Sequence, residues 1–168
     1  EIRGLSQKLN TRIGRAYSPT CPWIHARWDN VSTYVTSVEC GVTLAPFIHS
    51  GSITGDYGNP TFSFVDTAST QIVGYYNDGI ITFLTGANAM LSREIRRWGD
   101  VASTFELYRP YPYAVVIGDT YKAVAGDDKS FDTCKNKFNN IVPLGGGGFG
   151  GMPDIPGITN VYSNPVKF

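Results

Sequence analysis

The chain has 168 residues, 14 Lys and Arg balance 14 Asp and Glu, and only 17% of the residues are charged. A chain without net charge lacks the positive surface that nucleic-acid and anionic-membrane binders need, which argues against both classes. No apolar run approaches the roughly 20 residues that cross a bilayer. The length suits one domain, and the 19 glycines and 10 prolines are typical of short strands joined by many turns.

Residues 1–20 are expected to form an arm or linker. Leu5, Leu9 and Ile13 recur every four residues, which predicts a short helix or a docking segment. The prolines at 19 and 22 then place Cys21 in a rigid turn, because each proline fixes its own φ and disfavours helix before it.

The middle of the chain reads as a series of short strands. Alternation of apolar and polar residues, β-branched runs and turn dipeptides mark their ends. We predict a mainly β fold, a small irregular barrel- or sandwich-like meander with long loops. The predicted strands are residues 52–54, 61–66, 71–76, 80–84, 92–98, 103–108, 113–117 and 120–124, with a helix as the alternative for 91–97.

One short helix is predicted near the C-terminus, at about residues 127–140. Phe131, Cys134 and Phe138 share one helical face, and Asp127 or Asp128 is expected to cap the N-terminus. The glycine run that follows contains a G-x-G-x-x-G spacing, but a proline-rich segment stands where a dinucleotide site needs a helix. We therefore predict a tightly packed or mobile loop there.

The three cysteines, Cys21, Cys40 and Cys134, are widely spaced. Disulfide frameworks use an even number, and zinc knuckles use close pairs, so spacing alone favours three buried apolar side chains. His25 and His49 are the only histidines. A Cys–His nucleophile pair stays open as an alternative, which would make the chain a cysteine hydrolase acting on cell wall. We name no catalytic residue and expect no enzyme.

Four stretches of the sequence form a recognisable series of motifs. They are CGVTL at 40–44, DGIITFLTGANA at 78–89, GDTY at 118–121 with GDDK at 126–129, and TC at 133–134 with KFNN at 137–140. Together they resemble the C-terminal half of phage tail-tip hub proteins, namely the lambda minor tail protein L group and the related DUF2163 (BR0599) family. The segment GGMPDIPG at 150–157 is similar to the closing motif of that family. The order of the motifs over residues 20–157 makes the match specific.

The resemblance implies a structural virion protein of the tail tip, or baseplate hub, that helps to close the tail tube. Residues 21–168 would be the hub C-terminal domain. It implies a homotrimer whose partners are the distal tail ring, the remaining hub domains, the tape measure and the central fibre. The family carries further domains before this region, so these either belong to another chain or are missing from a fragment. A cofactor-free interaction module is the other alternative.

The resemblance also implies a structural [4Fe-4S] cluster. Cys21, Cys40 and Cys134 match three of the four family ligands, and Asp127 stands where the fourth cysteine is expected. A carboxylate is a harder ligand for iron than a thiolate. Asp127 could ligate iron, the cluster could have three protein ligands and an open iron, or no cluster could bind. We take Asp127 as the fourth ligand and rank His25 below it.

Overall fold

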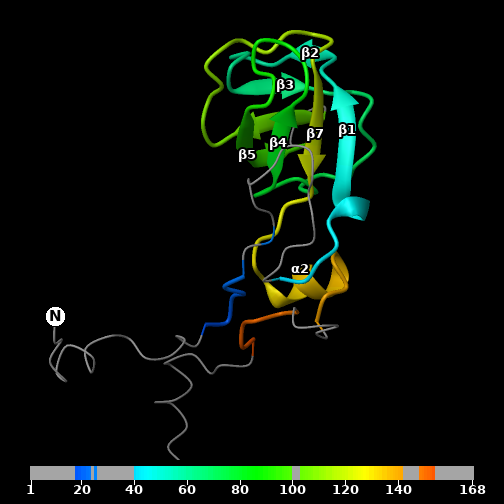
Figure 1. The fold of residues 1–168 in the computed structure, drawn as a ribbon, viewed down its shortest axis with the longest axis vertical. Helices are drawn as coiled ribbons and strands as arrows, with labels where there is room; N and C mark the ends of the chain where they lie inside the picture. Colours follow the sequence, from blue (N-terminus) through cyan, green and yellow to red (C-terminus); the bar gives the residue numbers. More distant parts are fainter. Residues whose placement is uncertain (1–17, 24, 26–39, 100–102, 142–147, 154–168) are drawn as a thin grey trace, which may run out of the picture.

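A computed structural model describes residues 18–23, 25, 40–99, 103–141 and 148–153. Over these residues the fold is mainly β with one short α-helix, α2 (Phe131–Asn136), and the predicted fold class is confirmed. A curved sheet forms one end of the molecule, and α2 lies at the other (Figure 1). The predicted helix around residues 5–13 lies outside the described residues.

Within the described part of the chain, seven antiparallel strands form a single sheet. Its spatial order is β1-β7-β4-β5-β6-β3-β2, so β7, the last of these seven in sequence, lies inside the sheet between β1 and β4. A short 3-10 helix, η1 (Ala45–Phe47), leads into the first strand. The strands are β1 (Ile48–Ser52), β2 (Gly55–Asp56), β3 (Ser63–Val65), β4 (Ile80–Phe83), β5 (Ser92–Trp98), β6 (Thr104–Leu107) and β7 (Thr120–Val124).

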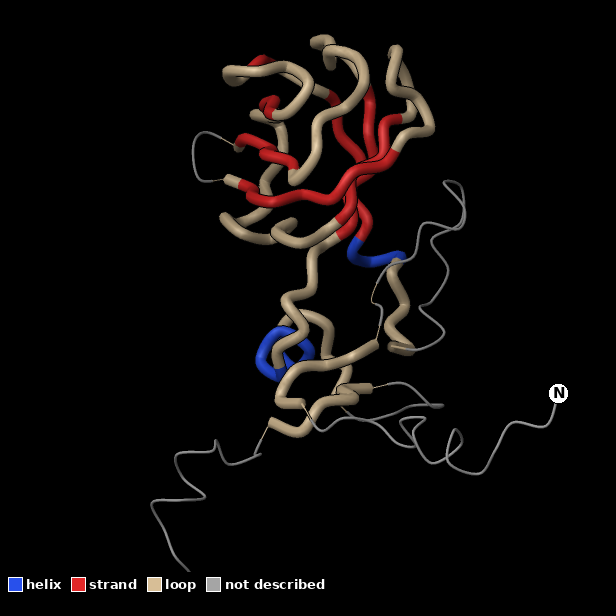
Figure 2. The backbone as a smooth tube through the Cα atoms, turned by 90° about the vertical axis from the view of Figure 1, so that its left-hand side faces the viewer, coloured by secondary structure: helices blue, strands red, loops and turns tan. Residues whose placement is uncertain are grey.

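The sheet curls because β5 changes partner along its length. Its first half pairs with β4, its second half pairs with β6, and an irregularity lies between Ile95 and Arg97. Such bulges bend a strand and increase its twist. Ile95 and Trp98 are buried in the main core, where the Trp98 ring packs 4.3 Å from the Phe105 ring. Figure 2 shows the resulting curvature of the strands.

Two predicted strands are wrong. Residues 71–76 form turns, in which Gly74 has a φ of 80° and the Asn77 side chain accepts a hydrogen bond from the Trp98 backbone at 2.8 Å. Residues 113–117 are irregular, and the Asp119 carboxylate accepts a hydrogen bond from the Val116 backbone at 3.0 Å. In both places a side-chain oxygen accepts a hydrogen bond from a backbone N–H group, and that N–H group is then not available for pairing with a neighbouring strand. The predicted strand at 52–54 is displaced, since β1 ends at Ser52.

The predicted helix is shorter than 127–140. Lys129 has a φ of 65°, which an α-helix does not accommodate, so the helix begins only after Ser130. The Ser130 hydroxyl caps it by accepting from the Thr133 backbone at 3.1 Å, which corrects the expectation of an aspartate cap. Phe138 lies beyond the end of α2. Among the described helices none is long and apolar enough to cross a membrane.

A second, smaller core lies below the sheet. We call its surroundings the cysteine lobe, comprising residues 18–23, 25, 40–44, 126–141 and 148–153. Strand β7 links the two parts: Tyr121 and Ala123 belong to the main core, whereas Val124 belongs to the second. The second core consists of Cys40, Val42, Leu44, Val124, Ala125 and Phe138.

A buried tyrosine pair should make the protein sensitive to alkali. Burial raises the pKa of Tyr76 to about 12, and it also raises the pKa of Tyr121, whose hydroxyl donates to Asp66 at 2.5 Å. Unfolded tyrosines ionise near pH 10, so the folded state is favoured fully below that pH and loses stability as the pH rises from about 10 to 12. Thermal unfolding followed by circular dichroism at pH 8 to 11 should show this loss. Tyr76→Phe should make the thermal stability depend less on pH, whereas Tyr113→Phe, at an exposed position, should leave the dependence as it is in the wild type. A Tyr76→Phe variant with the pH dependence of the wild type would contradict this role of Tyr76.

Candidate metal centre

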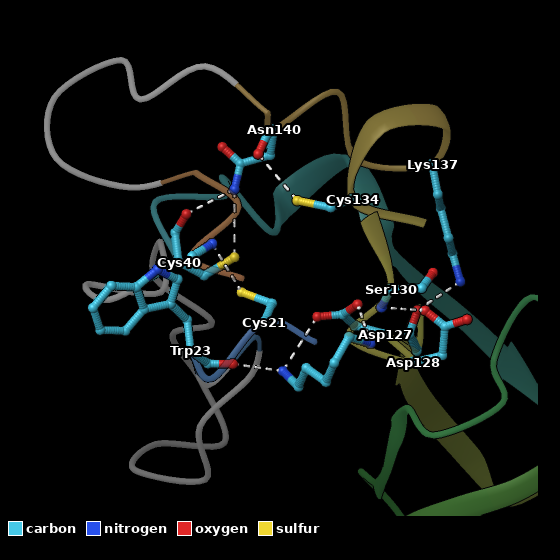
Figure 3. A network of polar contacts seen from close by, with 12 residues as sticks. Cys21, Trp23, Cys40, Asp127, Asp128, Ser130, Cys134, Lys137 and Asn140 are labelled. Carbon is cyan, nitrogen blue, oxygen red and sulfur yellow. Dashed lines mark hydrogen bonds and ion pairs between the residues drawn. The ribbon is translucent and has the colours of Figure 1, made fainter. Parts of the chain in front are cut away.

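The fold brings the three cysteines together in the cysteine lobe. Cys21, Cys40 and Cys134 are each at most 6% exposed, and none of the three forms a disulfide. Each comes from a different part of the lobe: the Pro-flanked turn, the approach to η1, and α2. Figure 3 shows the three side chains around one region, with Asp127 beside them. The three cysteines, which are widely spaced in the sequence, therefore lie in one region of the fold.

Backbone contacts between distant segments hold Cys21 in place. Its backbone N–H donates to the Lys129 carbonyl at 2.8 Å, and its Sγ accepts from the Gly150 N–H at 3.4 Å. The end of the glycine run at Gly150 thus lies against Cys21, which agrees with the tightly packed alternative there; residues 142–147 lie outside the described residues. Gly151 leaves no room for a side chain, since a Cβ there would lie 2.8 Å from the Thr20 carbonyl carbon.

Asn140 connects the other two cysteines. Its side-chain amide donates to the Cys40 carbonyl at 2.7 Å and to Cys40 Sγ at 3.4 Å. Its own carbonyl accepts from Cys134 Sγ at 3.0 Å. N–H donors directed at sulfur are the kind of contact that stabilises a thiolate and tunes a cluster potential. The sequence pattern assigned Asn140 no role beyond the family resemblance.

Asp127 lies beside the thiols and already has partners. Its Oδ1 accepts from the Lys129 backbone at 2.9 Å, and its Oδ2 forms an ion pair with Lys129 Nζ at 3.2 Å. Lys129 Nζ also donates to the Trp23 carbonyl at 2.7 Å. The Asp127 side chain is only 8% exposed, whereas that of Lys129 is 34% exposed, so the carboxylate is the buried partner of this ion pair. Asp127 thus shapes the turn before α2 and binds it to the Cys21 segment.

His25 is buried in the same lobe without polar partners. It is 5% exposed, and neither Nδ1 nor Nε2 has a hydrogen-bond partner among the described residues. The ring packs on Phe138, a member of the core that contains Cys40, with 4.2 Å between centroids. Burial lowers the pKa of His25 to about 4, although the Asp127 charge opposes this shift. The imidazole is therefore neutral at pH 7.

The thiols are electrostatically coupled and poorly suited to nucleophilic catalysis. Burial raises the pKa of Cys40 and raises that of Cys134 to about 12, and the charges of the neighbouring cysteines and Asp127 add to both shifts. A cysteine nucleophile needs a lowered pKa. For Cys40 and Cys134 the environment acts in the opposite direction.

The donor chemistry fits an iron–sulfur cluster, whose irons take thiolates and, in some centres, imidazole. Three buried thiols and an unpartnered imidazole lie in one lobe. Within the described residues, however, no group of three or more His, Cys, Asp or Glu side chains is arranged to hold a metal ion. The lobe thus contains suitable donor atoms, but they are not arranged as the ligands of a metal ion. Bound metal would favour the thiolate form that burial disfavours.

Comparisons with known proteins point to phages. A family model described as "Phage conserved hypothetical protein BR0599" matches residues 74–158, a range that includes Asp127 and Cys134 but neither Cys21 nor Cys40. A solved structure described as "Virion of native gene transfer agent (GTA) particle" is similar, with a TM-score of 0.62 and 25% identity. The match covers 99% of this chain and 53% of the virion chain, so this chain spans about half the length of that relative. No curated protein matches.

Proposed function

Since the chain belongs to the family described as phage conserved hypothetical protein BR0599, we propose that it is a structural component of a phage or phage-like virion, located at the tail tip. The observation that carries the virion assignment is the likeness of almost the whole chain to a chain of a gene transfer agent particle. The tail-tip position rests on the hub motifs of the sequence, such as GDDK at 126–129 and TC at 133–134.

The proposed role is to help close the tail tube as part of a baseplate hub. The expected assembly is a homotrimer in contact with the distal tail ring, the tape measure and the central fibre. The matched virion chain is nearly twice as long, which leaves room there for further hub domains. In this role the neutral, weakly charged composition suits a protein covered by partners on several sides. Enzymatic activity plays no part in it.

We further propose that a [4Fe-4S] cluster fastens the cysteine lobe. Cys21, Cys40 and Cys134 would supply thiolates, and Asp127 is the fourth ligand expected from the sequence. A cluster here would join the Cys21 turn, the Cys40 segment and α2, which the second core of six residues holds only weakly. The role is structural, because metal binding free energy adds to folding free energy where the apolar core is small.

Anaerobic purification followed by iron and acid-labile sulfide analysis tests the cluster. We expect a brown protein with near-stoichiometric iron, and we expect Cys134→Ala to lose the iron and to unfold the lobe, detected as rapid proteolysis after residue 125. Lys135→Ala, an exposed position on the same helix, is the matched control and should keep both. Iron-free wild-type protein would refute the cofactor and leave the virion assignment intact.

The tail-tip assignment has its own test. Antibody labelling of intact particles, followed by negative-stain electron microscopy, should place the protein at the distal end of the tail. Labelling of the capsid alone would contradict the assignment.

A further inference from the structure

The cysteine lobe contains a polar group that folding alone does not explain. Both ring nitrogens of His25 are buried, and neither has a hydrogen-bond partner among the described residues. A buried polar atom without a partner destabilises a fold, so such groups in native structures call for an explanation such as a ligand, an ion or a reaction. The ring packs on Phe138, next to the core around Cys40, which places this unsatisfied donor in the lobe of the three thiols.

Asp127 differs from His25 in each of these respects. Both of its carboxylate oxygens are engaged by Lys129, one through the backbone N–H and one through the ammonium group. To bind iron, Asp127 would have to give up the ion pair and leave the Lys129 ammonium group, on a side chain that is 34% exposed, with the Trp23 carbonyl as its acceptor. Giving up both contacts of the carboxylate would weaken the turn before α2. His25 has no such contact to lose.

Charge also distinguishes the two residues. Three thiolates already bring negative charge into a buried lobe, and charges that are buried without compensation are strongly unfavourable. A carboxylate ligand would add a further negative charge, whereas a neutral imidazole adds a donor without charge. Imidazole also replaces thiolate on iron in known cluster types, while oxygen ligands are harder and suit iron–sulfur irons less well.

We propose that His25 is the fourth protein ligand of the metal centre formed by Cys21, Cys40 and Cys134, and that Asp127 is a positioning residue that holds Lys129 and the Cys21 turn. This inference rests on the cluster of the proposed function and names its coordination in this chain. Ligation would satisfy one of the two unpartnered ring nitrogens. It would also explain why His25 follows Cys21 by only four residues, because one short stretch of the sequence would then supply two ligands.

Three variants and one spectroscopic measurement test the proposal on the full chain, purified anaerobically. His25→Ala should lower the iron bound per protein at least three-fold, and His25→Cys should restore iron while shifting the visible absorption. Asp127→Asn, which keeps the shape of the side chain, should retain iron close to the wild-type level. Pulsed electron paramagnetic resonance of the reduced wild type should show strong nitrogen hyperfine coupling from an imidazole, and His25→Cys should remove it.

The outcomes separate this inference from the cluster itself. Iron-free wild-type protein would refute both. Iron-containing wild type without imidazole coupling would overturn the role of His25 and leave the cluster standing, as would loss of iron in Asp127→Asn but not in His25→Ala. The hyperfine measurement uses the wild type and the His25→Cys rescue uses a donor of the family type, so misfolding of His25→Ala alone does not decide the question.

Discussion

Replacing Gly126 with alanine should unfold the junction between the sheet and the cysteine lobe, at a cost of more than about 3 kcal/mol. A Cβ at this position would overlap the Asn77 carbonyl oxygen and lie 2.6 Å from the Gly79 backbone nitrogen. Both neighbours are backbone, so no side-chain rotation relieves the clash. Gly126 also donates to the Tyr75 carbonyl at 3.2 Å and accepts from Lys137 Nζ at 2.7 Å. A displaced backbone would lose these contacts as well.

Urea denaturation of Gly126→Ala and Gly55→Ala, followed by circular dichroism and by thiol alkylation, measures this effect. Gly55 is the matched control, because a Cβ there meets only Val65 Cβ at 3.8 Å, an ordinary contact. The Gly55 variant should unfold within about 1 kcal/mol of the wild type. Similar midpoints for the two variants would show that the backbones at residues 77–79 and 126 separate easily, contrary to this prediction.

The glycines of the motifs that carry the family resemblance thus have a physical reason. The predicted strands at 71–76, 80–84 and 120–124 leave Gly79 and Gly126 in the connections beside them, but nothing in the sequence indicates that these two glycines pack against each other. A Cβ on Gly79 would overlap the Val124 carbonyl oxygen. Contacts of this kind join residues almost fifty positions apart, and local periodicity carries no information about them.

Strands were predictable where alternation and packing agree. β4, β5, β6 and β7 fall within the predicted ranges, because each buries one apolar set in the main core. The two segments wrongly predicted as strands, 71–76 and 113–117, contain apolar residues with strand propensity. Ile72 and Val116 in these segments are nevertheless more than 60% exposed. There the backbone follows glycine and Asx-type turns, and β-propensity is too weak to outweigh them.

The candidate site was also only partly predictable, because it depends on contacts between residues that are far apart in the sequence. The family resemblance selected Cys21, Cys40, Cys134 and Asp127, which spacing alone would have left as scattered residues. It gave Asn140 and Lys129 no role, although they contact Cys40 and Asp127 directly. It also ranked His25 below Asp127, because the burial of an imidazole without partners is a three-dimensional property. A histidine four residues from a predicted ligand was the available signal.

Trp98→Ala should lower the free energy of unfolding by about 3–5 kcal/mol, the usual range for removing a buried large aromatic side chain. Trp98 is 1% exposed, and its ring lies 4.3 Å from that of Phe105 and 5.1 Å from that of Tyr76. Arg96→Ala on the same strand is the control, because its ion pair with Glu106 is exposed and contributes about 1 kcal/mol or less.

The same variant tests whether the sheet and the cysteine lobe unfold together. Strand β7 places Tyr121 in the main core and Val124 in the second core, and Tyr75 packs against both. Because β7 cannot unfold with the sheet and still hold Val124 in the second core, we expect the lobe to lose its order when the sheet unfolds in urea. Alkylation of Cys40 and Cys134 should therefore begin at the urea concentration at which the Trp98→Ala sheet melts. Thiols that stay protected after the sheet has unfolded would contradict this coupling. They would mean that the lobe is held together independently of the sheet, for example by a bound cluster.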